Sequence, residues 1–255
     1  MSHILDSFKL DGKTAVVTGA SRGLGQGMAV ALAEAGADIV AVSSTPSMET
    51  RSMIEALGRR CVVVEADLGD RNAVRRIIPE ARGGFASLDI LVNCAGIIRR
   101  ADFLEFTEKD WDDVMGVNLD AVFLLSQCFS RDVVERGSTG KIIHIASMLS
   151  YQGGVRVPSY TSSKSAVIGL TRLMANELAA KGINVNAIAP GYMATDNTAA
   201  LRGDEERNQA ILGRIPAGRW GTPDDLKGAV VFLASSASDY VHGYTIAVDG
   251  GWLAR

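Results

Sequence analysis

Short apolar runs rich in β-branched residues alternate along this chain with longer segments in which apolar residues recur every three or four positions. The short runs indicate strands buried on both faces and the longer segments indicate helices, a combination typical of a parallel sheet covered by helices on both sides. The sequence therefore predicts an α/β fold with a doubly wound parallel sheet. Seven strands are expected, at Thr14–Thr18, Asp38–Ser43, Cys61–Glu65, Leu88–Asn93, Lys141–Ala146, Ile183–Ala189 and Thr245–Val248. Crossover helices are expected at Gly25–Ala35, Trp111–Val134 and Ser163–Ala180.

One domain spanning residues 1–255 is the organisation that the sequence favours. No Pro/Ser-rich linker, charge block or internal repeat divides the chain, and 47% of its residues are hydrophobic, which is enough for one sizeable core. The least periodic stretch runs from about residue 190 to 222, where Gly, Pro, Asn and charged residues interrupt any regular pattern. Because long stretches of this kind in compact domains are usually lids or binding loops, this one is expected to cover the substrate.

Composition argues against several classes of protein. A formal net charge of −3 gives no basic surface for nucleic acid or for an anionic membrane, so neither partner is expected. No apolar run approaches the ~18 residues of a membrane span, and the first eleven residues lack the pattern of a signal peptide. A cytoplasmic location is therefore expected.

The cysteines and histidines do not form a ligand cluster in the sequence. Cys61, Cys94 and Cys128 are far apart in apolar surroundings, which is typical of small core side chains rather than of a disulfide or a metal site. His144 likewise lies inside the apolar run Ile142–Ile145. The sequence predicts no metal site.

The first expected strand leads directly into a glycine-rich turn, Thr18–Gly25, and then into a helix. Backbone amides and the positive end of that helix can receive a pyrophosphate, and Gly19, Gly23 and Gly25 permit its close approach. Because the spacing differs from Gly-x-Gly-x-x-Gly, the turn taken alone fits a plain strand-to-helix connection equally well. Its position after the first strand favours a dinucleotide site.

Residues with matching chemistry follow later strands, at the edge where ligands bind to a doubly wound sheet. Asp67 can bond an adenine amino group, although it can also cap a helix. The small residues of Asn93–Gly96 let a ribose approach, and Pro190–Gly191 with Thr195 can fix a nicotinamide carboxamide. Each is ambiguous by itself, and their common location at strand ends supports the interpretation.

The choice between NAD and NADP depends on the end of the second strand, where an acidic side chain would bond the ribose and repel a 2′-phosphate. This chain has Ser43, Ser44 and Thr45 there. The missing carboxylate and the nearby Arg22 make NADP physically acceptable, yet no second basic residue stands beside the serines. The residues alone leave the choice open.

Tyr160 and Lys164, four residues apart, form the candidate proton-transfer pair. Hydride addition to a carbonyl leaves an alkoxide that needs a proton, and a phenol with a pKa of about 10 needs a nearby cation to act near neutrality. Lys164 lies one helical turn along on the same face. Ser147 can hold the substrate oxygen, and Asn118 can position a water or the lysine for proton relay. Such a pair occurs by chance in many helices, and the ordered set of motifs makes the catalytic interpretation the stronger one.

Together these motifs resemble the short-chain dehydrogenase/reductase family over essentially the whole chain. The resemblance implies a Rossmann-type fold, NAD(P)-dependent oxidoreduction at CH–OH groups, and catalytic roles for Asn118, Ser147, Tyr160 and Lys164. One departure is Cys94, where the family usually has an asparagine, and we expect little effect because Ala95 and Gly96 remain. The candidate dinucleotide contacts are Gly19, Ser21, Arg22, Gly23, Leu24, Gly25, Ser43, Asp67, Leu68, Asn93, Ala95, Gly96, Tyr160, Lys164, Pro190, Gly191, Met193 and Thr195.

Several segments look more narrowly like the branch of 2-dehydro-3-deoxy-D-gluconate 5-dehydrogenases, also described as 2-deoxy-D-gluconate 3-dehydrogenases. That branch implies a keto or hydroxy sugar-acid substrate, preference for NAD(H), homotetramers and a place in pectin or uronate breakdown. The segments are Gly96–Arg100, Ala146–Gly154, Arg156–Tyr160, Pro190–Thr195, Arg214–Gly221 and Asp249–Arg255.

A sugar acid carries a carboxylate and several hydroxyls, and arginine is the side chain best suited to bidentate carboxylate recognition. Each arginine near the expected site entrance fits a solvated basic rim or a subunit interface as well. The substrate candidates are Arg99, Met148, Gln152, Arg156 and Trp220, with Arg100 beside them.

Two alternatives remain open at this point. A 3-oxoacyl carrier-protein reductase or a glucose-type dehydrogenase would share the same motifs, because these identify chemistry better than substrate. A non-catalytic dinucleotide-sensing protein would keep the fold without turnover. Intact Ser147, Tyr160 and Lys164 argue against the second alternative.

Overall fold

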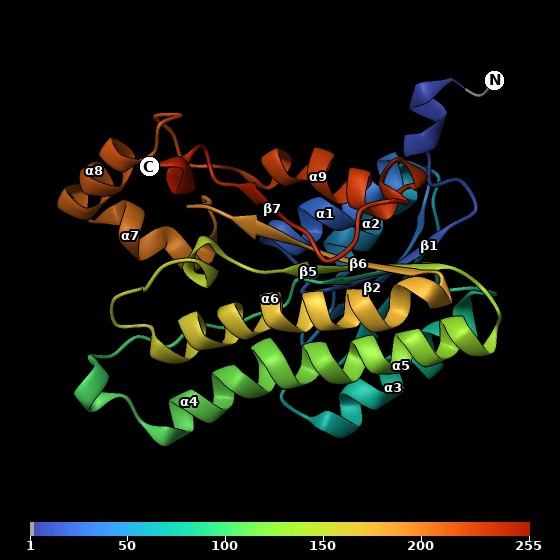
Figure 1. The fold of residues 1–255 in the computed structure, drawn as a ribbon, viewed down its shortest axis with the longest axis horizontal. Helices are drawn as coiled ribbons and strands as arrows, with labels where there is room; N and C mark the ends of the chain where they lie inside the picture. The colour runs from blue at the N-terminus through green and yellow to red at the C-terminus, as the bar shows by residue number, and fades with distance from the viewer. Residues whose placement is uncertain (1–2) are drawn as a thin grey trace.

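A seven-stranded parallel sheet runs through the centre of the computed structural model, which describes residues 3–255 and their side chains apart from that of Asn197 (Figure 1). Residues 1 and 2 of the predicted domain lie outside the described residues. Strand order reverses between β1 and β4, as in a doubly wound sheet, so the predicted fold class is confirmed. From edge to edge the strands are β3 (Cys61–Glu65), β2 (Asp38–Ser43), β1 (Thr14–Thr18), β4 (Ile90–Asn93), β5 (Gly140–Ile145), β6 (Ile183–Pro190) and β7 (Thr245–Val248).

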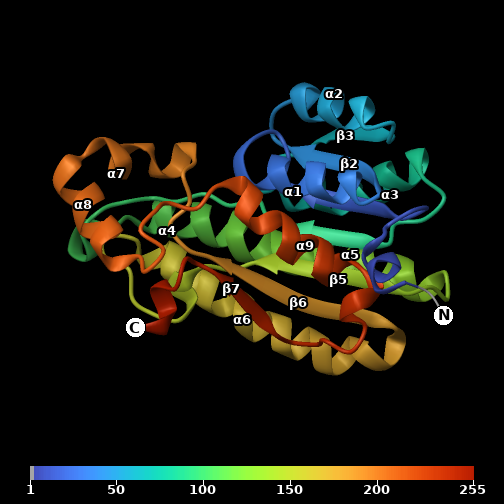
Figure 2. The same ribbon diagram turned by 90° about the horizontal axis from the view of Figure 1, so that it is seen from above.

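Helices cover both faces of this sheet (Figures 1 and 2). On one face lie α1 (Gly23–Glu34), α2 (Met48–Ala56) and α9 (Lys227–Ala234). The other face carries α3 (Arg71–Gly84), α4 (Glu108–Met115), α5 (Ala121–Glu135) and α6 (Pro158–Leu178). Two short helices, α7 (Ala199–Gly203) and α8 (Glu205–Arg214), lie beyond the carboxyl end of β6. Within residues 3–255, none of the helices has both the length and the apolar character that a membrane span requires.

Alternation along the strands divides the core into two layers. On β1, Ala15 and Val17 pack with α1 and α9, whereas Val16 packs with the cluster under α3 and α5. All three side chains are fully buried, and burial on both faces is why the strands of this sheet are largely apolar. Continuous burial makes the sheet a rigid base, and the loops at its carboxyl edge carry the polar residues.

Several predicted strands and helices begin or end at other residues than observed, and the structure departs further from the sequence prediction in two places. The expected helix Trp111–Val134 is divided, because a π-helical turn, Gly116–Asp120, separates α4 from α5. The stretch 190–222, interpreted as irregular, contains α7 and α8, so that part of the prediction was wrong. Its role as a substrate cover stays a prediction.

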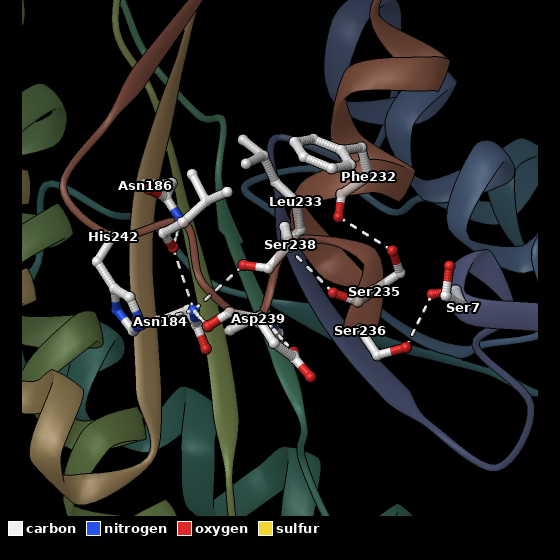
Figure 3. A network of polar contacts seen from close by, with 12 residues as sticks. Ser7, Asn184, Asn186, Phe232, Leu233, Ser235, Ser236, Ser238, Asp239 and His242 are labelled. Atoms are coloured by element: carbon white, nitrogen blue, oxygen red, sulfur yellow. Dashed lines mark hydrogen bonds and ion pairs between the residues drawn. The ribbon is translucent and has the colours of Figure 1, made fainter. Parts of the chain in front are cut away.

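At the amino end of β6, a network of polar contacts fixes the connection from α9 to β7 (Figure 3). The Nδ2 of Asn184 donates to the carbonyls of Asp239 at 2.9 Å and Val241 at 3.1 Å. Asn186 donates to the Val241 carbonyl at 2.8 Å and accepts the Tyr244 amide at 3.0 Å. Since strands begin at this edge and end at the other, the network is structural and lies away from the ligand-binding edge.

Candidate active site

A cleft of about 320 Å³ opens at the carboxyl ends of β1 to β4. It brings together residues that the sequence placed far apart, in the strand-end arrangement expected of a dinucleotide site. Twelve of the predicted dinucleotide contacts line it: Gly19, Ser21, Arg22, Gly23, Leu24, Gly25, Ser43, Asp67, Leu68, Ala95, Gly96 and Thr195. The other lining residues are Ser44, Ala66, Cys94, Ile97, Val117 and Asp196.

The glycine-rich turn is shaped by close backbone contacts that only glycine permits. Gly19 and Gly23 have φ values of +69° and +60°, in the left-handed region. A Cβ on Gly25 would lie 2.1 Å from the Gly19 carbonyl oxygen, and one on Gly19 would lie 2.9 Å from the Ala95 Cα. The first turn of α1 has no side-chain cap, because Arg22 at the N-cap makes no such bond. Its amides are therefore free to bind an anion at the cleft.

Some predicted contacts lie outside this cleft. Asn93 is 3% exposed, and its Nδ2 donates to Ser126 Oγ at 3.0 Å on the opposite side of the strand. Gly191 and Met193 line a neighbouring cavity of about 160 Å³, and Pro190 is a buried residue of β6. The cofactor roles predicted for Asn93, Pro190, Gly191 and Met193 therefore need backbone contacts or the neighbouring cavity. The other two predicted contacts, Tyr160 and Lys164, do not line the cleft either.

Thr18 is a structural residue of the site that sequence reasoning treated only as the start of the turn. Its Oγ1 accepts the amide N–H groups of Cys94 at 3.0 Å and Ala95 at 3.1 Å. These bonds tie the end of β1 to the segment after β4, which forms the opposite wall of the cleft. The sequence did contain a signal for this role, because Thr18 places a hydroxyl at the last position of a central strand.

At the end of β2, a turn replaces the acidic residue that would select NAD. Ser43 Oγ donates to the Thr45 carbonyl at 2.6 Å and lies 2.6 Å from Ser47 Oγ. Ser44 lines the cleft beside it. Arg22 lies across the cleft, 3.5 Å from a carboxylate oxygen of the exposed Asp196.

Tyr160 and Lys164 project from the first turns of α6. Lys164 is 4% exposed, its Nζ donates to the Ile145 carbonyl at 2.7 Å, and this nitrogen is 5.8 Å from the Tyr160 ring centroid. Burial lowers the pKa of Lys164 to about 8, because a buried ammonium loses hydration. The amine of Lys164 can therefore lose its proton close to neutral pH.

Burial also raises the pKa of Tyr160 above its ordinary value. A hydrogen bond from Ser147 and the charge of Arg100 act in the opposite direction, while Cys94 raises this pKa further. The sequence predicted Lys164 as the cation that lowers it, and in this structure Lys164 instead donates to a carbonyl. The modulating role of Lys164 stays a prediction.

Asn118 sits in the π-helical turn between α4 and α5 and is fully buried. Its Oδ1 accepts the Ile97 amide at 2.9 Å, and its Nδ2 donates to the Ile97 carbonyl at 3.0 Å and to Ser163 Oγ at 3.3 Å. A Cβ on Gly96 would lie 3.2 Å from Asn118 Oδ1 and 3.6 Å from Lys164 Nζ. Asn118 therefore joins the wall of the cleft to the helix that carries the tyrosine and lysine.

The arginines among the substrate candidates are held by acidic partners. Arg99 lies 3.4 Å from Asp110, and Arg156, with a φ of +64°, lies 2.9 Å from Asp102. Arg100 was named beside the candidates, and it is the arginine whose charge lowers the pKa of Tyr160.

The remaining candidates contact the segment that contains α7 and α8. Gln152 accepts from Arg214 Nη2 at 3.1 Å, and Trp220 donates to Asn208 at 2.7 Å. Met148, next to Ser147, is 5% exposed and packs in a cluster with Ile211, Ile215 and Trp252. These contacts connect the segment to the loop that follows Ser147.

Among residues 3–255, His, Cys, Asp and Glu form no group of three or more able to hold a metal ion. Cys61, Cys94 and Cys128 are free thiols.

Comparison with known proteins gives consistent results. Residues 19–253 match a family model described as enoyl-(acyl carrier protein) reductase. The chain is 62% identical to the 2-dehydro-3-deoxy-D-gluconate 5-dehydrogenase of Escherichia coli (strain K12) over 99% of its own length and 100% of that protein. It is 61% identical to the protein of the same name from Dickeya dadantii (strain 3937), with the same coverage.

Among solved structures, a protein described as a 2-deoxy-D-gluconate 3-dehydrogenase from Agrobacterium tumefaciens, with bound NADP, superposes with a TM-score of 0.93. It is 55% identical, and the match covers 98% of this chain and 100% of that one. A gluconate 5-dehydrogenase from Burkholderia cenocepacia J2315, in complex with NADP and tartrate, is 41% identical with a TM-score of 0.94, covering 99% and 100% of the two chains.

Proposed function

The chain belongs to the short-chain dehydrogenase/reductase family of NAD(P)-dependent oxidoreductases, and from that premise we propose that it interconverts a keto and a hydroxy sugar acid, as a 2-dehydro-3-deoxy-D-gluconate 5-dehydrogenase. The observation that carries the proposal is the placement of Tyr160, bonded to Ser147 and one turn from the buried Lys164. The relatives that bear this name match over the full length of the chain.

The cleft fits a dinucleotide in its donor set and its shape. The uncapped amides of α1 and the tight Gly19–Gly25 contact provide an anion cradle that a Cβ would fill. Asp67 lies where its carboxylate can accept from an adenine amino group, while it also accepts the Gly69 amide at 2.9 Å. The dinucleotide, when bound, supplies or accepts the hydride.

We assign the proton to Tyr160. In the reducing direction its O–H donates to the substrate oxygen, which Ser147 holds with a second hydrogen bond. Because burial raises the pKa of Tyr160, the acid form predominates at neutral pH. In the oxidising direction the phenolate must accept the proton, so activity in that direction rises with pH.

Lys164 and Asn118 complete the proton path in this proposal. The positive charge of Lys164 favours the phenolate electrostatically, and its pKa of about 8 lets it release a proton near neutrality. A π-helical turn breaks the regular helix bonding around Asn118, as such turns often do at functional sites. Relay through Asn118 to solvent is the role this position supports.

The cofactor choice follows from the end of β2. No carboxylate stands at Ser43 or Ser44 to repel a 2′-phosphate, and Arg22 faces the cleft. The related structures named above contain NADP. We propose that the protein accepts NADP, while the preference for NAD(H) expected from the sequence resemblance stays a prediction.

For the substrate carboxylate, we propose Arg100. The charge of Arg100 lowers the pKa of Tyr160, so this guanidinium lies close to the group that transfers the proton. Arg100→Ala is expected to raise KM for the keto sugar acid about tenfold or more, because a charge-assisted bond is lost. Arg99→Ala is the matched control and should change KM less than twofold; the reverse ranking would move the carboxylate to Arg99.

Acyl carrier-protein thioesters are a second candidate substrate class, because the matched family model is described as an enoyl-(acyl carrier protein) reductase. Turnover of acyl thioesters without turnover of keto sugar acids would select that class. We further propose that the protein is a cytoplasmic homotetramer, that residues 190–222 cover the substrate, and that the enzyme acts in pectin or uronate breakdown. Assembly and growth measurements would test these parts of the proposal.

A further inference from the structure

A row of hydrogen-bonded, buried polar side chains crosses the molecule behind the catalytic residues, on the face covered by α5 and α6. Asn93 on β4 and His144 on β5 are register partners. Asn93 Nδ2 donates to Ser126 Oγ of α5 at 3.0 Å, and this hydroxyl lies 3.2 Å from His144 Nε2. On the other side of the ring, Nδ1 lies 2.9 Å from Thr171 Oγ1 of α6. Ser126, His144 and Thr171 are fully buried.

The hydrogen bonds fix which group donates and which accepts at each contact in this row of side chains. Thr171 Oγ1 donates to the Val167 carbonyl at 2.7 Å, so toward the ring it acts as acceptor and His144 Nδ1 carries the proton. Nε2 then accepts from Ser126, whose oxygen in turn accepts from Asn93. Burial, with the nearby charge of Lys164, lowers the pKa of His144 to about 3, so the ring is neutral at physiological pH.

This row of side chains attaches α6 to β5 next to the contact that holds Lys164. Lys164 Nζ donates to the carbonyl of Ile145, the residue that follows His144. Thr171 lies two helical turns beyond Lys164, about 10 Å along the same helix. Two polar contacts from neighbouring residues of β5, one at each end of this helical segment, therefore define where α6 sits on the sheet. Apolar packing is non-directional and does not define this register as sharply.

We propose that His144 and Thr171 are positioning residues for Lys164, and through it for Tyr160, acting through the Nδ1–H bond of a single neutral tautomer of His144. The inference rests on the proposed function in that Lys164 serves Tyr160. Asn93 and Ser126 hold the tautomer by occupying Nε2. None of these four side chains lines the cleft.

Thr171→Val and Thr171→Ser form the matched pair that tests this proposal. Valine keeps the shape and removes the acceptor, whereas serine keeps the hydroxyl. Thr171→Val is expected to lower kcat about tenfold, as a displaced catalytic group does, while Thr171→Ser stays within about twofold of the wild type. Asn186→Leu, which removes buried hydrogen bonds from β6 to the connection that precedes β7, controls for loss of stability alone.

A second readout does not depend on any substrate. The titration of Lys164, followed by NMR of protein with labelled lysine and assigned with Lys164→Met, should move upward by about half a pH unit or more in Thr171→Val, because a displaced lysine meets more water. Tyr160, Cys94 and His144 are the other titratable groups near this lysine, and none of them is substituted in the variant. An unmoved titration, with kcat equal to that of the serine variant, would overturn the proposal.

If Thr171→Val does not fold, two substitutions of His144 replace it. Asparagine offers an N–H near the position of Nδ1, and glutamine offers one near the position of Nε2, so the proposal predicts higher kcat for His144→Asn. Equal activities, or higher activity of His144→Gln, would contradict it. A wild-type protein that turns over no substrate would refute the proposed function, and the lysine titration would still decide this inference.

Discussion

Replacing Lys164 with methionine should make the protein more stable and less active. Methionine has a similar shape and no charge, so the change removes the ammonium from its buried position beside Ile145. The pKa of Lys164 falls from 10.5 to about 8 on folding. That fall is about 2.5 pH units, and at 1.36 kcal/mol per unit it destabilises the folded state by about 3 kcal/mol when the lysine is protonated in both states.

The stability gain should depend on pH in a defined way. Between pH 8 and 10.5 the unfolded chain binds more protons at this lysine than the folded protein does, so wild-type stability rises with pH across that window. Loss of the bond to the Ile145 carbonyl costs about 1 kcal/mol at every pH. Lys164→Met should therefore exceed the wild type by about 2 kcal/mol near pH 6, and by almost nothing near pH 9.5.

Urea unfolding of both proteins without cofactor, at pH 6, 8 and 9.5, measures this difference. Thr171→Ser provides a comparison variant that keeps the charge of Lys164. A Lys164→Met protein that is less stable than the wild type by the same amount at all three pH values would refute the reasoning, because it would show that burial does not oppose this charge.

Three further predictions concern the cofactor and the proton. Gly25→Ala should abolish dinucleotide binding in a calorimetric titration, since its Cβ would lie 2.1 Å from the Gly19 carbonyl oxygen. Ser44→Asp should lower kcat/KM for NADP by about a hundredfold or more and leave NAD nearly unchanged, because a carboxylate at this position of the cleft repels a 2′-phosphate; equal losses for both cofactors would count against the site. The rate of alcohol oxidation should rise between pH 7 and 9 because Tyr160 must be deprotonated and burial raises its pKa, while the carbonyl reduction rate should not rise; initial rates in both directions check this.

The fold was predictable from the sequence because the strands are short, largely apolar runs rich in β-branched residues. β1 and β2 have the predicted bounds, since buried β-branched runs end sharply at polar turns. The break at Gly116–Asp120 was not predictable, because residues of a π turn keep helical dihedral angles and the apolar spacing continues through them. α8 was missed because its sequence is mostly polar, although Asp204, whose side chain caps the helix at the Arg207 amide, was a usable signal.

The site was predictable to the extent that its residues are fixed by strand ends. Ser147, Tyr160 and Lys164 follow the fifth strand in order. Because β5 lies beside β4, Lys164 comes near Gly96, a residue of the cleft wall. The partners of the arginines were not predictable, because Arg156 meets Asp102 through a backbone geometry with positive φ that no local pattern indicates. The contacts of His144 were not predictable either, because its two hydrogen-bond partners, Ser126 and Thr171, come from two different helices.

The central claim, that Tyr160 donates and accepts the proton, is tested most directly by Tyr160→Phe. The measurement is the rate at which reduced nicotinamide is consumed with a saturating keto sugar acid, alongside dinucleotide affinity. We expect kcat to fall about a thousandfold while dinucleotide affinity changes little, because phenylalanine keeps the ring and cannot donate a proton. Turnover within a few-fold of the wild type would contradict it.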